Sequence, residues 1–198
     1  MNIWLLRPLP HGTDQLDNFL EHNFIAVGYP VGETFKDCSY NDIRKLLAKF
    51  QWEEGLGNVN ILVKDMKIGD LVVVPSTNKK DIYFGEIISD YVYNKNVDKD
   101  LEGSGYPHQR EVKWIFDKKP LLRNDLPNEL RSSLRYPGAV ADLTKHAAIV
   151  EKLLNGGISE TMDSIEARAI RVVEELLESN NEEIQLKAAQ IILSLKGR

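Results

Sequence analysis

Apolar runs alternate with glycine and proline turns along most of the chain, a pattern typical of short strands interrupted by helices. Two β-branched runs, Gly69–Pro75 and Phe84–Ile88, are separated by a polar loop and predict paired strands. Further strands are expected at 3–6, 24–29, 90–93, 106–116 and 138–143. Strands and helices in this order favour an α+β fold built on a small mixed β-barrel with flanking helices.

Helical spacing of apolar residues appears between these strands. Ser39 and Asp42 have the spacing of a capping box and predict a helix that begins there. Other helices are expected after Thr13-Asp14, through 58–66, from Asn124 with its cap and a proline in the first turn, and from Thr144 to the glycines at 156–157.

The end of the chain has a different pattern. Two apolar stripes at helical spacing, 165–177 and 184–195, flank the turn at 179–181 and predict an antiparallel helical hairpin. We therefore divide the chain into a barrel domain, 1–155, and a C-terminal hairpin, 156–198. A lone hairpin cannot bury both stripes, so we expect it to mediate homo-oligomerisation or bind a partner protein. Docking on its own barrel is the alternative.

Composition excludes several classes of protein. The 198 residues carry a formal net charge of -5, which disfavours binding long duplexes by phosphate neutralisation alone. Cys38 has no cysteine partner, which favours a reducing, cytoplasmic location. The first residues lack the leading positive charge of a signal peptide, and no segment approaches the roughly 20 apolar residues of a membrane span.

Several blocks occur in an order that is similar to a known domain. They are Trp4, Arg7, Val27–Tyr29, Gly69–Pro75, Gly85–Ile87, Tyr91, Tyr93 and His108–Trp114. Residues 1–145 with these blocks resemble the PUA-like, EVE-related domain at the N-terminus of Mrr-type restriction endonucleases. Tyr29 stands where that pattern more often has tryptophan, and the nuclease domain is missing. The resemblance implies a reader of a base, plausibly a modified one, that acts in restriction or in phage–host conflict.

A base held outside its stack needs aromatic faces and a few hydrogen-bonding groups. Asp70 and Glu86 are candidate acceptors for an exocyclic amine, and Arg7, His108 and Arg110 are candidates for a phosphate. The candidate aromatic residues are Trp4, Tyr29, Tyr91, Tyr93 and Trp114. We expect only one of Tyr91 and Tyr93 to line a pocket. Each candidate also has an ordinary structural interpretation, such as core packing for Trp4 or a turn for Asp70.

Two sets of residues have the chemistry of catalytic groups. Asp98 or Asp100 followed by Glu111 and Lys113 imitates the carboxylate and lysine set of metal-dependent nucleases, but the same residues fit an amphipathic strand. Ser132, Ser133 and Cys38 lack the sequence context of a catalytic nucleophile. We therefore expect no enzymatic activity, no cofactor and no metal.

Three functions remain open. The first is a reader of a base in DNA or RNA, and the second is a binder of a free nucleotide or nucleotide-derived signal. A basic groove leading from the pocket would favour the first, and its absence the second. The third is a protein adaptor that uses the helical tail.

Overall fold

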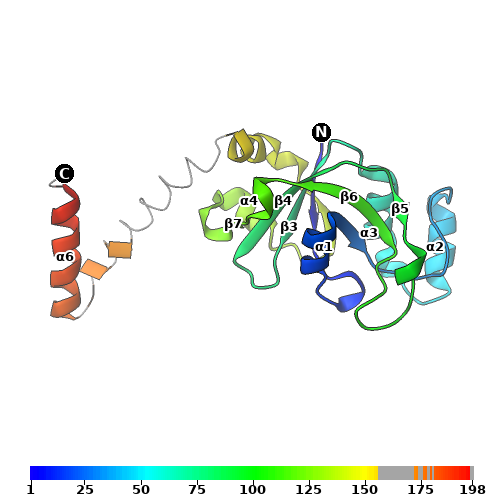
Figure 1. Ribbon diagram of the computed structural model, residues 1–198, viewed down its shortest axis with the longest axis horizontal. Coiled ribbons are helices and arrows are strands. Elements are labelled where there is room, and N and C mark those ends of the chain that lie inside the picture. The colour runs from blue at the N-terminus through cyan, green and yellow to red at the C-terminus, as the bar shows by residue number, and fades with distance from the viewer. Residues whose placement is uncertain (156–171, 174–175, 178, 180, 197–198) are drawn as a thin grey trace. The chain divides into compact units, whose positions relative to one another are not determined.

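A computed structural model describes residues 1–155, 172–173, 176–177, 179 and 181–196. The chain divides into two compact units, Met1–Ile149 and Val150–Arg198 (Figure 1). The first unit contains the sheet and the pocket described below. The prediction of strands interrupted by helices is confirmed for this unit, which has a mixed α+β architecture.

Eight short strands form one curled sheet in the described part of the chain. They are β1 (Ile3–Leu6), β2 (Phe24–Val27), β3 (Leu71–Pro75), β4 (Asp81–Ile87), β5 (Val92–Tyr93), β6 (His108–Trp114), β7 (Leu121–Leu122) and β8 (Val140–Asp142). The main path runs β2-β6-β4-β3-β1-β8, while β5 pairs with β6 and β7 with β4. The two end strands of this path, β2 and β8, do not pair with each other. The curled sheet is therefore open and forms a half-barrel.

The centre of the sheet follows from the apolar pattern. Every residue of β3 is buried, and β3 pairs in parallel with β1 and antiparallel with β4. A strand with both faces covered needs a continuous apolar run, which Leu71–Pro75 supplies. All other strand pairs are antiparallel.

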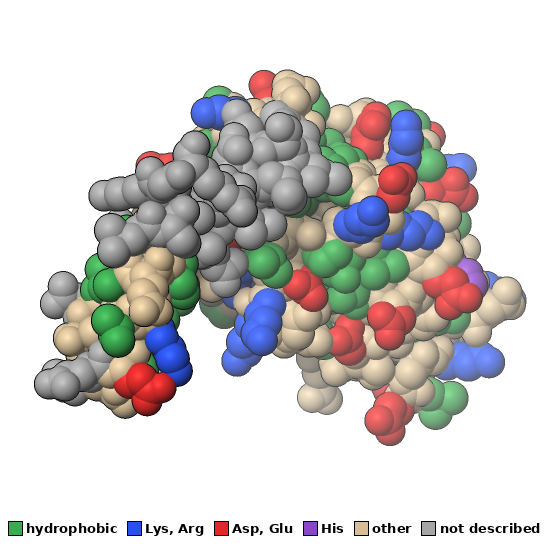
Figure 2. Space-filling view, turned by 60° about the vertical axis from the view of Figure 1, so that its left-hand side comes forward, with side chains coloured by type: hydrophobic (Ala, Val, Ile, Leu, Met, Phe, Trp, Pro, Cys, Tyr) green, Lys and Arg blue, Asp and Glu red, His purple; other side chains and the backbone are tan. Residues whose placement is uncertain are grey.

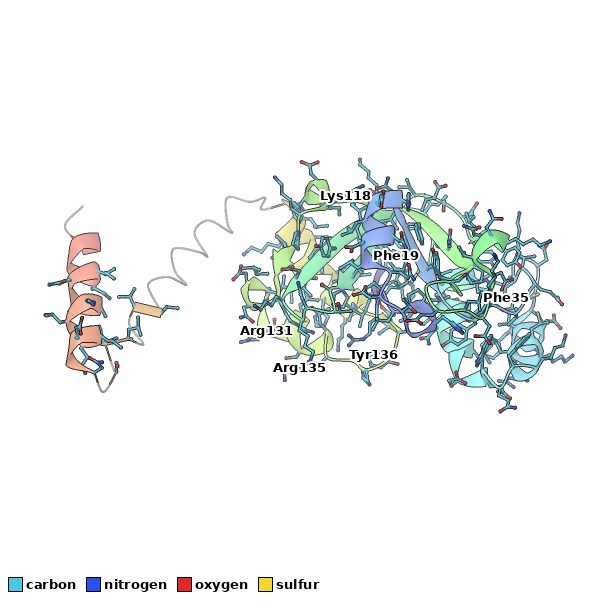
Figure 3. The ribbon with its side chains drawn as sticks, turned by 60° about the horizontal axis from the view of Figure 1, so that its bottom comes forward. Phe19, Phe35, Lys118, Arg131, Arg135 and Tyr136 are labelled. Atoms are coloured by element: carbon cyan, nitrogen blue, oxygen red, sulfur yellow. The ribbon has the colours of Figure 1, made fainter. Side chains whose placement is uncertain are left out.

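Helices of the first unit pack around the sheet (Figure 1). Their bounds are α1 (Leu16–His22), α2 (Tyr40–Ala48), α3 (Leu56–Asn60) and α4 (Asn128–Ser133). A further helical stretch covers 147–155, and α6 (Glu182–Lys196) belongs to the second unit. The capping box at the start of α2 is confirmed, because the Ser39 side chain accepts from the Asp42 backbone and Asp42 accepts from the Ser39 backbone. The largest fully buried side chains include Phe19 and Phe35, labelled in Figure 3.

Three expectations on secondary structure need correction. The helix expected through 58–66 is α3 followed by a π-helical turn, Ile61–Asp65. The helix expected from 124 begins later, because the 3-10 turn Arg123–Asp125 precedes it and Pro127 is the N-cap. The strand expected at 90–93 is reduced to β5. The first arm of the predicted hairpin falls largely outside the described residues. The helix predicted for its second arm is present as α6.

None of the described helices combines the length and the apolar character that crossing a membrane requires.

Candidate functional site

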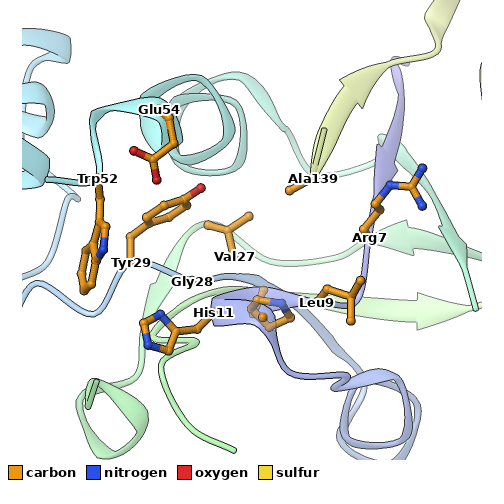
Figure 4. Close-up of a pocket in the computed structure, with 12 residues that line it drawn as sticks. Arg7, Leu9, His11, Val27, Gly28, Tyr29, Trp52, Glu54 and Ala139 are labelled. Atoms are coloured by element: carbon orange, nitrogen blue, oxygen red, sulfur yellow. The ribbon is translucent and has the colours of Figure 1, made fainter. Parts of the chain in front are cut away.

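A pocket of about 240 Å³ opens beside the ends of β1 and β2 (Figure 4). Sites for drug-sized ligands typically measure about 300–1,000 Å³, so this volume suits a single small ring system. Its lining comes from the segment after β1, from β2 and the residues that follow it, from the turn before α3, and from the residue before β8. The lining residues are Arg7, Leu9, Pro10, His11, Gly12, Ala26, Val27, Gly28, Tyr29, Trp52, Glu54 and Ala139.

Three rings meet at one end of the pocket. The ring centroids of Tyr29 and Trp52 lie 6.3 Å apart at an interplanar angle of 64°, and those of His11 and Trp52 lie 5.7 Å apart at 77°. These edge-to-face contacts make the rings walls of a corner instead of a closed stack. Outside the corner, Phe50 stacks on Trp52 at 5.1 Å and is 43% exposed.

Strained backbone holds two of these rings in place. His11 and Tyr29 have φ values of 52° and 71°, in the left-handed region that side chains other than glycine rarely adopt. Such conformations persist only where the surroundings enforce them, and they cluster at binding sites. Two of the non-glycine residues with a positive φ therefore line this pocket.

Glycines allow the chain to approach the rings closely. A Cβ atom at Gly55 would lie 2.1 Å from the Tyr29 ring, and one at Gly105 would lie 2.7 Å from the His11 ring. A Cβ atom at Gly28 would lie 2.7 Å from the His11 backbone nitrogen. The pocket geometry therefore requires glycine at these three positions.

A chain of hydrogen bonds fixes the Tyr29 backbone. The Tyr29 carbonyl can only accept, so His108 Nε2, 3.0 Å away, carries a proton and donates to it. Burial lowers the pKa of His108 to about 4, with this bond acting in the opposite direction, so the ring is neutral at pH 7. Nδ1 is then the acceptor for the Tyr91 hydroxyl at 2.7 Å, and that oxygen accepts from the Phe35 amide at 3.2 Å. His108 thus positions Tyr29 from behind.

Polar groups give the pocket its chemical character. The Asp100 carboxylate accepts through Oδ1 from His11 Nε2 at 2.7 Å, which orients the imidazole. Asn58 Nδ2 donates to the Tyr29 hydroxyl at 3.3 Å. Burial raises the pKa of Tyr29; the Asn58 bond opposes this and the Glu54 carboxylate adds to it. The site therefore offers a carboxylate acceptor beside aromatic faces.

Arg7 lies at the other end of the pocket, away from the ring corner (Figure 4). Its Nε donates to the Gly138 carbonyl at 3.2 Å, and its Nη2 donates to the carbonyls of Leu134, at 3.3 Å, and Tyr136. Of the residues singled out from sequence, Arg7 and Tyr29 line the pocket.

Trp4 and Asp70 meet each other instead of the pocket. Trp4 Nε1 donates to the Asp70 carboxylate at 2.9 Å, and this carboxylate also accepts from the backbone amides of Asn2, at 2.7 Å, and Lys67, at 3.0 Å. Burial alone would raise the pKa of Asp70, but these hydrogen bonds outweigh it and leave that pKa below its usual range. Both side chains have partners inside the protein that fix the start of β1 against β3.

Arg110 is buried with its donors on backbone carbonyls. Its Nε donates to Leu62 at 2.6 Å, its Nη2 to Val63 at 3.1 Å and its Nη1 to Ser89 at 3.0 Å. The guanidinium therefore closes the end of the π-helical turn, whose last carbonyls have no partner within the helix.

The two remaining candidates belong to the sheet. Trp114 Nε1 donates to the Phe19 carbonyl at 3.0 Å, and Trp114 is buried. Glu86 lies on β4 opposite Lys113 of β6 and is half-buried. Neither residue lines the pocket of Figure 4.

We expected only one of Tyr91 and Tyr93 to line a pocket, but neither lines the pocket of Figure 4. Both rings lie near the His108 ring, with centroids 5.9 and 6.0 Å away. Residues two positions apart in an extended chain point to the same side, which explains the shared face. Tyr93 also donates to Asp98, and burial together with this carboxylate raises the pKa of the Tyr93 hydroxyl.

The carboxylates of the nuclease-like pattern are held by separate partners. Asp98 accepts from Tyr93, whereas Asp100 contacts His11, and Glu111 and Lys113 are exposed on β6. Within the described residues, no group of three or more His, Cys, Asp or Glu side chains is arranged to hold a metal ion.

Ser133 has a neighbour that the sequence did not indicate. Its hydroxyl lies 2.8 Å from His146 Nε2. Neither residue lines the pocket of Figure 4. The pair connects α4 with the 3-10 turn Thr144–His146.

Sequence reasoning missed Trp52, His11 and Glu54. Trp52 lies in the polar turn between α2 and α3, where it is partly buried against the core, and His11 lies between Pro10 and Gly12. A large aromatic residue in a turn is a sequence signal for a binding surface, since loops carry binding residues disproportionately.

Residues 9–135 match the family described as "Domain of unknown function (DUF8426)". The chain belongs to the DUF8426 family. The part that matches DUF8426 contains the ring corner of His11, Tyr29 and Trp52 and the Glu54 carboxylate, whereas Arg7 and Ala139 lie just outside it. No curated protein matches the chain.

Proposed function

We propose that this chain binds a nucleobase in the pocket of Figure 4, without catalysing a reaction. The corner of Tyr29, Trp52 and His11 carries the proposal, because unstacked bases are held by aromatic faces and every base has such a face. The Glu54 carboxylate beside the corner suits a ring with an exocyclic amine, as in cytosine or adenine.

The half-barrel agrees with the PUA-like, EVE-related resemblance, and we propose that the first unit is a domain of this kind. Tyr29 belongs to the block Val27–Tyr29 on which the resemblance rests, and it lines the pocket. A modified base is then a fitting ligand, in a role linked to restriction or phage–host conflict. The expected cytoplasmic location is part of the same proposal.

The second unit is proposed to couple copies of the chain or to bind a partner protein. In α6, the side chains of Ile184 and Leu186 are 37% and 60% exposed. Exposed apolar side chains are stabilised when another surface covers them. Pairing of two chains would raise the apparent affinity of a weak reader through avidity.

The test is a binding titration with single-stranded oligonucleotides that contain cytosine, 5-methylcytosine, 5-hydroxymethylcytosine or adenine, alongside the matching free nucleosides. Removing one stacking face costs about 1–3 kcal/mol per base, so Trp52→Ala should weaken binding about 5- to 150-fold. Tyr40→Ala is the matched control, because Tyr40 is 47% exposed on α2 and outside the pocket. Equal affinity of wild type and Trp52→Ala for every ligand would refute the proposal.

A further inference from the structure

Four arginines of the first unit, here called the arginine cluster, gather near the Arg7 end of the pocket. Arg7 follows β1 and Arg123 begins the turn after β7, while Arg131 lies in α4 and Arg135 just beyond it. Arg7 and Arg123 both donate through Nη2 to the Leu134 carbonyl, at 3.3 and 2.9 Å. Two cations therefore share one neutral acceptor.

The positive charges of the cluster act on one another. Burial and then the charges of Arg7, Arg135 and Arg131 hold the pKa of Arg123 below its usual range. In the part of the chain that the structure describes, no ion pair joins any member of the arginine cluster to a carboxylate. Like charges held together repel, so this arrangement is stabilised when an anion binds.

The end of α4 accounts for only part of this arrangement. The carboxyl end of a helix carries about half a negative charge, which favours a nearby cation. Leu134 is the C-cap of α4, and its carbonyl already receives two guanidinium groups. Arg131 contacts Asn128, and Arg135 is exposed. Four full charges thus exceed what one helix end balances.

Tyr136 connects the arginine cluster to the pocket. It is 48% exposed, and a Cβ atom at Gly138 would lie 2.3 Å from its ring, so the ring packs directly on Gly138. The Gly138 carbonyl accepts from Arg7, and the next residue, Ala139, lines the pocket. In Figure 3, Arg131, Arg135 and Tyr136 follow one edge of the unit, whereas Lys118 lies at the opposite edge.

Charges elsewhere are mixed. On the face presented in Figure 2, acidic and basic side chains are interspersed, and the whole chain has a net charge of -5. An anionic polymer would therefore be attracted locally at the arginine cluster instead of along the whole molecule.

We propose that the arginine cluster binds the phosphate backbone of the same polynucleotide strand whose base occupies the pocket. This inference rests on the proposed function and deepens it, since it names a polymer as the ligand. A free nucleotide carries its phosphates next to its own base, whereas a strand extends beyond the pocket and can reach Arg131 and Arg135. Guanidinium groups are suited to phosphate, and Tyr136 offers a stacking face between the two sites.

The experiment compares wild type, Arg131→Ala/Arg135→Ala, the control Lys113→Ala/Lys118→Ala, and Trp52→Ala. Lys113 and Lys118 both line a different pocket, and Lys118 lies at the edge opposite the arginine cluster, so this control removes two charges elsewhere. The probes are fluorescent single-stranded DNA 12-mers of defined base, the nucleoside monophosphate of the same base, and polyglutamate. Each is titrated by anisotropy or calorimetry at 50, 100 and 200 mM NaCl.

We expect Arg131→Ala/Arg135→Ala to weaken 12-mer binding about tenfold at 50 mM salt and to reduce the slope of log K against log salt by about 1.4. Its nucleoside monophosphate affinity should match wild type, and the lysine control should match wild type with both nucleic-acid probes. A 12-mer affinity and salt slope unchanged in the arginine variant would overturn the inference.

The two proposals fail in different ways. If Trp52→Ala has no effect but the arginine variant loses salt-dependent 12-mer binding, the arginine cluster stands and the base pocket fails. If the monophosphate binds through Trp52 and the 12-mer binds no better, the pocket stands and the polymer inference fails. Polyglutamate that binds as tightly as the 12-mer and competes with it would point to an acidic protein partner and also overturn the inference.

Discussion

The buried imidazole of His108 makes the stability of the first unit depend on pH. The ring is fully buried, and burial lowers its pKa from 6.5 to about 4, a difference of about 2.5 pH units. Each pH unit corresponds to about 1.36 kcal/mol, so the full effect is about 3 kcal/mol. The titratable side chains of Tyr91 and Tyr93 lie beside this ring and are neutral in this pH range, and the Asp98 carboxylate accepts from Tyr93.

The direction of the effect follows from proton uptake. Above pH 6.5 the imidazole is neutral in the folded and unfolded states, and its contribution to stability is complete. As the pH falls below 6.5, the unfolded chain takes up a proton that folded His108 does not accept until about pH 4. The free energy of unfolding therefore decreases as the pH falls from 6.5 to 4 and levels off below that.

Urea unfolding between pH 4.5 and 7.5, followed by tryptophan fluorescence, measures this dependence. His108→Gln keeps an amide donor and a carbonyl acceptor but does not titrate. As the pH falls over the full range, the free energy of unfolding of this variant should decrease about 3 kcal/mol less than that of wild type. His22→Gln is the control, because the His22 side chain is 62% exposed. Wild-type and His108→Gln curves that stay parallel from pH 7 to 4.5 would refute the reasoning.

Four further substitutions test the packing of the first unit. Gly55→Ala should displace the Tyr29 ring, because a Cβ atom at this position would lie 2.1 Å from it, and should weaken ligand binding in titrations. Gly57→Ala is the matched control in α3, where the added methyl group would meet open space. It should raise the free energy of unfolding by up to about 1 kcal/mol. Arg110→Met leaves three carbonyls without their donor and should lower urea stability by about 3 kcal/mol; a loss below 1 kcal/mol would contradict its buried role. Asp70→Asn should lower the free energy of unfolding by about 2 kcal/mol at pH 7. The difference from wild type should shrink as acid protonates the wild-type carboxylate, and urea unfolding at pH values down to 3 measures this change.

The sequence by itself determined most of the local structure. The β-branched run Leu71–Pro75 predicted β3, the apolar run Ile3–Leu6 predicted β1, and Ser39 with Asp42 predicted the start of α2. These features depend on side chains a few residues apart, whose spacing is visible in the chain. Tyr29 was also singled out from sequence, as the aromatic residue of the block Val27–Tyr29 on which the resemblance rests.

The tertiary structure decided which candidates share a site. Trp52 and His11 are separated by 40 positions of chain yet form one corner, because the turn before α3 packs against the segment after β1. Arg110 and Trp4 have the chemistry of ligand-binding residues, but folding supplies them with partners inside the protein. Three-dimensional packing decides which side chains are buried, which distant segments touch, and which donors share the Leu134 carbonyl. No pattern of neighbouring residues in the sequence indicates these contacts, so only the folded chain reveals them.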